Sequence, residues 1–294
     1  MKRILLFLAT NIAVLVVLSV VASLLGVDRF VTNQGLSWPA LLGFAAVFGF
    51  GGALISLAIS KRMALWQTGA QVIKQPANET EAWLQATVHR LAKQSQVGLP
   101  DVAIYDADEM NAFATGARRN AALVAVSSGL LRHMSREEVE AVLAHEVAHI
   151  ANGDMITMTL LQGVLNTFVI AISRAAGWAA AQAMSSRDEE GDGGPSYMVY
   201  FLVSLVVQIC LGIGATVIVM AFSRHREFKA DAGAAQLVGA TSMIQALQRL
   251  SADARDSALP EAVQAFGIRP GKSWMALFAS HPPIERRIEV LRGR

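Results

Sequence analysis

The stretch from residue 135 to residue 153 reads SREEVEAVLAHEVAHIANG and predicts a helix with a defined beginning and end. Ser135 and Glu138 form the S-x-x-E capping-box pattern at its start, and Asn152-Gly153 can terminate it. The apolar positions in between follow the helical period and are Val139, Val142, Leu143 and Ile150. The two histidines of this stretch therefore lie well inside a helix.

His145 and His149 are four residues apart, which places them on one face of that helix, where they can share a metal ion. Glu146 follows the first histidine and can reach a water molecule on the same metal. This H-E-x-x-H arrangement is typical of zinc proteases with a zincin-like fold. A bare motif of this kind also occurs by chance on polar helix faces, so a third ligand has to be found.

The composition favours a membrane protein with a modest soluble portion. The chain of 294 residues is 53% hydrophobic and 16% charged, against about 25% charged in an average soluble domain, and its mean hydropathy is +0.42. The net charge of +2 and the lack of a basic patch argue against nucleic acid as a partner. Cys210 is the single cysteine, which excludes an intrachain disulfide and a cysteine zinc cluster.

Apolar runs long enough to cross a bilayer occur four times. They cover about residues 4–26, 38–60, 155–184 and 197–222. The first run could be a cleaved signal peptide, but its length exceeds the roughly 7–15 apolar residues usual there, so we favour a retained anchor. Arg174 falls near the middle of the third run, where a charge is costly. An alternative is that runs three and four form a hairpin packed on the soluble domain.

The basic residues beside the runs predict the orientation. Lys2 and Arg3 precede the first run, Lys61 and Arg62 close the second, and Arg224 and Arg226 follow the fourth. Since cytoplasmic loops are enriched in lysine and arginine, both termini and the H-E-x-x-H helix are expected in the cytoplasm.

The soluble part is expected to form one α+β domain from two separate segments. The predicted division is 1–62 as an N-terminal transmembrane hairpin, 63–154 and 223–294 as the two parts of a protease domain, and 155–222 as a second transmembrane hairpin. Short strands are predicted at 102–105, 111–115 and 122–127, with helices at 81–96, 223–237, 241–250 and after Pro282-Pro283. The expected fold is mainly α, with four transmembrane helices and a small antiparallel sheet.

The third metal ligand is predicted to be Glu227. It follows the fourth run, where the chain returns to the membrane face that it left after Ile150. Asp231 lies one helical turn further on and can orient a ligand histidine by accepting its second ring N–H. His225 is a rival third ligand, but it points to a different helix face from Glu227.

Residues 223–231 read SRHREFKAD and match the pattern S-R-x-x-E-x-x-A-D. With the H-E-x-x-H helix, the NAFATG segment at 111–116 and His281-Pro282, the chain resembles the HtpX-type bacterial membrane zinc endopeptidases, relatives of the prenyl-protein-processing zinc proteases. The resemblance covers nearly the whole chain. It implies that His145, His149 and Glu227 bind one Zn²⁺ per chain, that Glu146 is the catalytic base, and that the protein is a multi-pass protein of the bacterial inner membrane.

The expected reaction is hydrolysis of a peptide bond by a water molecule that zinc and Glu146 activate. By resemblance, His281 is the candidate stabiliser of the tetrahedral oxyanion; the alternative is that it caps the helix after Pro282. Substrate is expected to pair with an edge strand at 111–115. Asn111 either hydrogen-bonds the substrate backbone or only ends a turn.

The expected substrates are cytosolic segments of misfolded or damaged membrane proteins, cut in quality control beside the bilayer. A prenylated peptide is less favoured, because a large lipid-holding chamber needs more than four spans. The alternative function is a non-hydrolytic membrane zinc carrier or sensor. That function requires ionisable metal ligands within the spans, and the charged residue that the third and fourth runs offer is Arg174, which repels cations.

Overall fold

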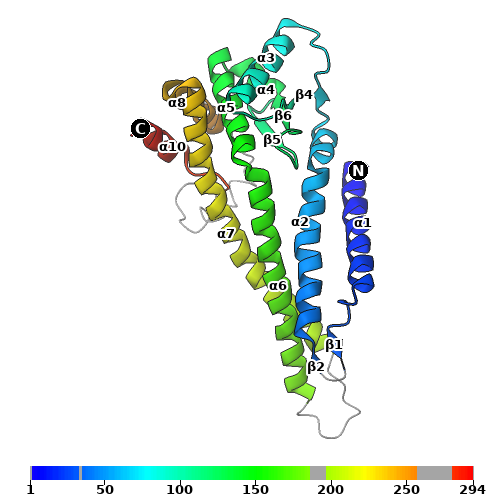
Figure 1. The fold of residues 1–294 in the computed structure, drawn as a ribbon. Coiled ribbons are helices and arrows are strands. Elements are labelled where there is room, and N and C mark those ends of the chain that lie inside the picture. Colours follow the sequence, from blue (N-terminus) through cyan, green and yellow to red (C-terminus); the bar gives the residue numbers. More distant parts are fainter. Residues whose placement is uncertain (1, 33–34, 186–196, 257–279, 294) are drawn as a thin grey trace. The chain divides into compact units, whose positions relative to one another are not determined.

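The computed structural model describes residues 2–32, 35–185, 197–256 and 280–293 (Figure 1). The acidic loop between the third and fourth apolar runs lies outside these residues. The chain divides into two compact units, one formed by 1–56 with 158–219 and the other by 57–157 with 220–294. Unit 1 contains most of the apolar runs, and unit 2 contains the H-E-x-x-H helix.

Unit 1 is built from long apolar helices. Among the described residues, three helices are long and apolar enough to cross a membrane: α2 (Trp38–Thr68), α6 (Asp154–Ser185) and α7 (Tyr197–Val238). Helix α1 spans Lys2–Leu24, and its apolar part with described side chains, Ile12–Leu24, is shorter. The fourth span therefore stays a prediction. A two-stranded antiparallel pair, β1 (Val31–Thr32) and β2 (Gly35–Leu36), joins α1 to α2.

The surface of unit 1 is apolar, as a lipid-facing surface requires. Phe168 and Val206 are 59% and 58% exposed, although water would oppose such exposure of large apolar side chains. The helices approach one another where one of them carries a small residue. A side chain at Gly49 of α2 would overlap Thr167 of α6, and one at Gly177 of α6 would overlap Ser204 of α7. Small residues at such crossings are typical of membrane helices.

Arg174, which the sequence places in the third run, lies on α6 within hydrogen-bonding reach of Tyr200 on α7. The stretch 155–173 before it is uncharged and is about 28 Å long at 1.5 Å per residue. That length nearly matches a hydrocarbon core of about 30 Å. Arg174 thus faces a polar group on the neighbouring helix, and a bilayer can be crossed without burying its charge in lipid.

Helix α7 corrects one expectation from the sequence. We predicted a span at 197–222 followed by a separate helix at 223–237, but Tyr197–Val238 is one unbroken helix of 42 residues. The junction contains no proline, glycine or capping residue pair that would end a helix, so nothing interrupts the hydrogen-bond ladder. At about 63 Å, α7 is twice as long as a bilayer core is thick, and its last turns belong to unit 2.

The sheet of unit 2 corrects a second expectation. Its strands are β3 (Gln71–Val72), β4 (Asp101–Tyr105), β5 (Ala112–Thr115) and β6 (Leu123–Ser127), in the order β3-β4-β6-β5. The expected antiparallel sheet is wrong for one pair, since β4 and β6 run parallel. All five residues of β6 are buried, which suits a central position, and half-buried β5 takes the edge. Strand β3 was not predicted.

Helices cover this sheet and enclose the core of unit 2. They are α3 (Glu79–Gln94), α4 (Ser128–His133), α5 (Arg136–Asn152), α8 (Ala240–Asp256) and α10 (Ile284–Arg292). The predicted capping box at Ser135 and Glu138 is present, and Gly153 ends α5 with φ 69° in the left-handed region. The core joins α3, α5, α8 and α10 to one sheet face through residues such as Leu84, Leu143 and Leu247. This packing holds α5 rigidly beneath the edge strand.

Candidate metal centre

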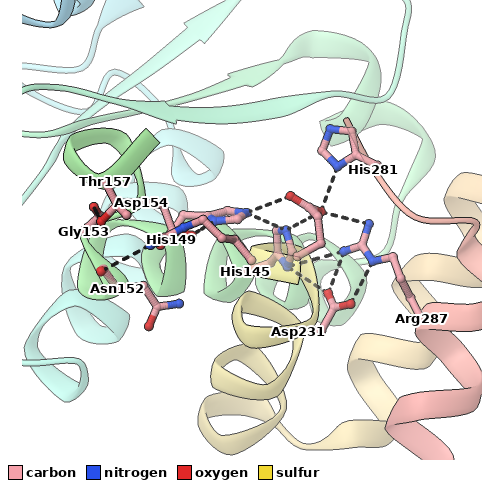
Figure 2. Close-up of polar contacts among 11 residues, drawn as sticks. His145, His149, Asn152, Gly153, Asp154, Thr157, Asp231, His281 and Arg287 are labelled. Carbon is pink, nitrogen blue, oxygen red and sulfur yellow. Dashed lines mark hydrogen bonds and ion pairs between the residues drawn. The ribbon is translucent and has the colours of Figure 1, made fainter. Parts of the chain in front are cut away.

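Helix α5 brings the two predicted histidine ligands together. Their Nε2 atoms are 3.1 Å apart, and their rings meet edge to face with centroids 4.6 Å apart. His145 is 6% exposed, and the His149 side chain is 16% exposed. Both rings therefore turn a nitrogen toward the same point in a largely buried site (Figure 2).

Glu227 reaches the same point from α7. Its carboxylate oxygens lie 3.5 Å from His145 Nε2 and 3.3 Å from His149 Nε2. The side that α7 buries carries Glu227, Ala230, Asp231 and Ala234, and it packs against α5, where Gly233 lies close to Ala148. His225, the rival third ligand, is exposed. The grouping that offers three ligand atoms within 4.8 Å of one another consists of His145, His149 and Glu227.

Asp231 and Arg287 orient His145, and we call these three residues the C-terminal bracket. His145 Nδ1 lies 3.0 Å from Asp231 Oδ1. Arg287 of α10 donates two hydrogen bonds to the same carboxylate, at 2.8 Å from Nε and 2.6 Å from an Nη atom. The sequence predicted Asp231 in this position, and the structure adds Arg287, whose other Nη atom is 3.4 Å from Glu227.

His149 is oriented by the membrane bracket: His149, Asp154 and Arg226. His149 Nδ1 lies 2.5 Å from Asp154 Oδ2. Asp154 Oδ1 pairs with Arg226 of α7, and both side chains are nearly buried, at 8% and 12% exposed. In both brackets, the histidine Nδ1 atom thus faces an aspartate carboxylate, and that carboxylate forms an ion pair with an arginine.

The electrostatics of the site favour positive charge between the carboxylates. Burial raises the pKa of the Glu227 carboxyl, but hydrogen bonds from His145, His149 and His281 outweigh it and hold that pKa well below its usual range. Burial likewise opposes ionisation of Asp231, yet hydrogen bonds from Arg287 and His145 lower its pKa. Burial lowers the pKa of His145, but hydrogen bonds to Asp231 and Glu227 raise it above its ordinary value.

These residues fit a zinc ion. Carboxylates on both Nδ1 atoms favour the tautomer with the proton on Nδ1, so neutral rings turn two Nε2 lone pairs toward each other at 3.1 Å. Glu227 Oε2 is buried, with His281 Nδ1 at 2.8 Å and His145 Nε2 at 3.5 Å. Ligand atoms about 2.0–2.1 Å from a tetrahedral zinc are about 3.3 Å apart, and the ligand atoms here are 3.1–3.5 Å apart. A metal ion placed between these three atoms would be bound by all of them, which is the protein ligand set of a catalytic zinc site.

Glu146, the predicted base, is half-buried beside this cluster. Within the described part of the chain its carboxylate forms no ion pair or hydrogen bond, although its charge acts on Tyr105 of β4 and on Arg287. Its oxygens are therefore free to accept a proton from a water molecule at the site.

The structure places His281 beside Glu227 and Asn111 directly before β5. His281 Nδ1 is 2.8 Å from Glu227 Oε2, and the His281 side chain is 64% exposed. The capping alternative fails, because the N-cap of α10 is Pro283 and receives no side-chain hydrogen bond. Asn111 is exposed directly before β5, and its backbone pairs with Ser127 through Asn111 O, which accepts from Ser127 N at 2.9 Å, and through Asn111 N, which donates to Ser127 Oγ at 3.0 Å.

Three residues of the site were not predicted: Asp154, Arg226 and Arg287. Arg287 had a signal, since it falls on the apolar stripe of the last helix between Ile284, Ile288 and Leu291, where a charge needs a partner. Asp154 directly follows the predicted helix end at Gly153, close enough to fold back on His149. Arg226 gave no such signal, because a basic residue after an apolar run is ordinary.

Comparison with known proteins identifies the family. The sequence model of peptidase family M48 matches residues 78–294. A protease HtpX homolog of Herminiimonas arsenicoxydans is 57% identical over 294 residues, which are 100% of this chain and 99% of the relative. One from Nitrosomonas eutropha is 58% identical over 100% of both chains. Protease HtpX of Aliivibrio fischeri strain ES114 is 57% identical over 99% of both.

The fold is shared with a solved structure. The crystal structure of S. mikatae Ste24p superposes with a TM-score of 0.70 at 18% identity and covers 99% of this chain. This chain spans 64% of that protein's length. At this identity the likeness concerns the fold alone.

Proposed function

The chain belongs to peptidase family M48, among the HtpX-type membrane metalloproteases, and we propose that it is an endopeptidase that depends on one zinc ion held by His145, His149 and Glu227. The observation that carries the proposal is the convergence of these three side chains, which offer ligand atoms within 4.8 Å of one another. Three protein ligands with one position left for water are the usual set of a catalytic zinc site.

In the proposed reaction Glu146 is the general base. Zinc, when bound, lowers the pKa of water toward neutrality and polarises a carbonyl group. Glu146 accepts the proton of the attacking water and then delivers it to the leaving amine. Its half-buried carboxylate, unpaired among the described residues, supports this role because no partner has to be displaced first.

His281 is proposed to stabilise the developing oxyanion. Its side chain is exposed and its Nδ1 atom lies 2.8 Å from Glu227, so His281 borders the three proposed metal ligands (Figure 2). A hydrogen-bond donor in this position favours the tetrahedral state over the planar peptide.

Substrate is proposed to pair with strand β5. This strand is hydrogen-bonded to β6 on one side and stands last in the strand order, so its other edge offers backbone groups to an extended peptide. Helix α5 packs against β5, which brings such a peptide near Glu146. Asn111 precedes the strand and is proposed to hydrogen-bond the peptide backbone.

The proposed setting is the bacterial inner membrane, with four spans and with unit 2 and both termini in the cytoplasm. The lysines and arginines beside the apolar runs support this orientation. A proteolytic site on the cytoplasmic side suits unfolded or damaged membrane proteins, cut in their cytosolic segments as quality control.

The test compares the purified wild-type protein with Glu146→Gln. Both are prepared without metal, reloaded with zinc, and assayed on casein and on an unfolded membrane protein. We expect the variant to bind zinc like the wild type and to lose cleavage by at least about 100-fold, the lower end for general-base catalysis. Wild-type rates in Glu146→Gln would refute the base. Zinc binding by a wild type that cleaves neither substrate would favour a carrier or sensor.

A further inference from the structure

The ion pair between Asp154 and Arg226 joins three helices at the metal site. Asp154 is the first residue of α6. Arg226 lies on α7 beyond its uncharged stretch 197–222, and its guanidinium also donates to the backbone oxygen of Asn152, at the end of α5, at 3.4 Å. The end of the H-E-x-x-H helix, the start of α6 and the part of α7 beyond its uncharged stretch therefore meet at one pair of charges.

The pair is nearly removed from water. The side chains of Arg226 and Asp154 are 12% and 8% exposed. Separating α6 from α7 at this point would leave a buried charge without its partner, which strongly destabilises a protein. The ion pair therefore holds the two helices together here.

The carboxylate of Asp154 is divided between two tasks. Oδ1 faces Arg226, and Oδ2 accepts from His149 Nδ1 at 2.5 Å. An acceptor on Nδ1 keeps the proton there and leaves Nε2 free for a metal, and it fixes the plane of the ring. Arg226 in turn holds the carboxylate of Asp154, which without the arginine would rotate more freely at the first residue of α6.

We infer that Asp154 is a positioning residue for His149 and that Arg226 acts through it, so that the metal affinity of the centre depends on the contact between α6 and α7. The C-terminal bracket has no such link, because its arginine comes from α10. The inference rests on the proposed zinc site but adds a condition to it: the metal is held tightly only while the start of α6 contacts α7 at Arg226.

Asp154→Asn in the full-length protein tests the first part. An asparagine amide can donate to Nδ1 and favour the tautomer that has no free Nε2, so the zinc affinity, measured by competition with a chelating dye, is expected to fall 10- to 100-fold. Asp154→Glu, which keeps the acceptor charge, is expected to recover part of the loss. Thermal unfolding of the metal-free proteins checks that both variants are folded.

Arg226→Gln tests the second part, with Lys229→Gln as the matched control. Lys229 lies on the same helix and is exposed, so its loss should leave zinc affinity unchanged. Because Arg226 is inferred to act through Asp154, the double variant Asp154→Asn/Arg226→Gln should bind zinc about as weakly as Asp154→Asn alone.

The outcomes separate this inference from the proposed function. A wild type that binds no zinc refutes the proposed function itself. A wild type that binds zinc with an Asp154→Asn variant of equal affinity refutes the positioning role. Losses from Asp154→Asn and Arg226→Gln that multiply in the double variant refute the action of Arg226 through Asp154.

Discussion

The two brackets around the metal site have the same composition but different attachments. In each, a histidine Nδ1 faces an aspartate that is paired with an arginine. The C-terminal bracket takes its arginine from α10, the last helix of the chain. The membrane bracket takes its aspartate from the first residue of α6 and its arginine from α7.

This difference shows that the metal site is also a point of assembly. The C-terminal bracket can form only after α10 has docked, since Arg287 makes both hydrogen bonds to Asp231. The membrane bracket can form only when α6 and α7 meet. The two proposed zinc-binding histidines of α5 are therefore oriented by parts of the chain that the H-E-x-x-H motif does not contain.

The variant with the largest expected effect removes the carboxylate that lies beside the histidines of both brackets. Glu227 lies near His145 and His149 alike, so Glu227→Ala should lower the zinc affinity by more than about 100-fold, the upper range for loss of an orienting partner, and abolish cleavage. Chelator competition measures the affinity. Exposed Glu289→Ala on α10 is the control, and equal affinities of the two variants would contradict the assignment.

The second variant removes a residue that belongs to neither bracket. His281→Ala should retain zinc and lower kcat by about 10²–10³-fold, as expected for loss of one oxyanion donor, while KM changes little. Steady-state kinetics with a peptide substrate separate the two constants. His225→Ala removes an exposed histidine of α7 and should change neither; an unchanged kcat in His281→Ala would exclude that residue from the mechanism.

The smallest effect on activity is expected when one bracket is weakened and the other stays intact. Asp231→Asn should reduce zinc affinity 10- to 100-fold. Arg287→Gln leaves the 2% exposed Asp231 without its arginine and should destabilise the metal-free protein by about 3–5 kcal/mol, seen as a lower midpoint of thermal unfolding. A midpoint equal to that of the wild type would show that the C-terminal bracket does not hold α10.

Local patterns in the sequence predicted the core of the site well. The capping box at Ser135 and the glycine at 153 set the limits of α5, and the spacing of four residues placed His145 and His149 on one face. The same spacing links Glu227 to Asp231 on α7. Such predictions succeed because capping and helical periodicity act between residues that are neighbours in the chain.

The errors occurred where distant segments decide the structure. Strands β4 and β6 are neighbours and run parallel because β5 lies at the edge of the sheet and not between them. The residue pattern of a single strand does not indicate this order. We predicted two helices within 197–237 because the sequence changes from apolar to charged after residue 222. The backbone stays helical across this change, so α7 is one helix.

By itself the sequence determined three membrane-length helices and the helix that carries H-E-x-x-H, and it predicted the three side chains that the structure brings together as possible metal ligands. Only the tertiary structure decided what orients them. His145 and Arg287 are 142 positions apart and His149 and Arg226 are 77 apart, and contacts over such separations depend on how α6, α7 and α10 pack around α5. Hydrophobic burial sets that packing, and buried charges then select the partners that satisfy them.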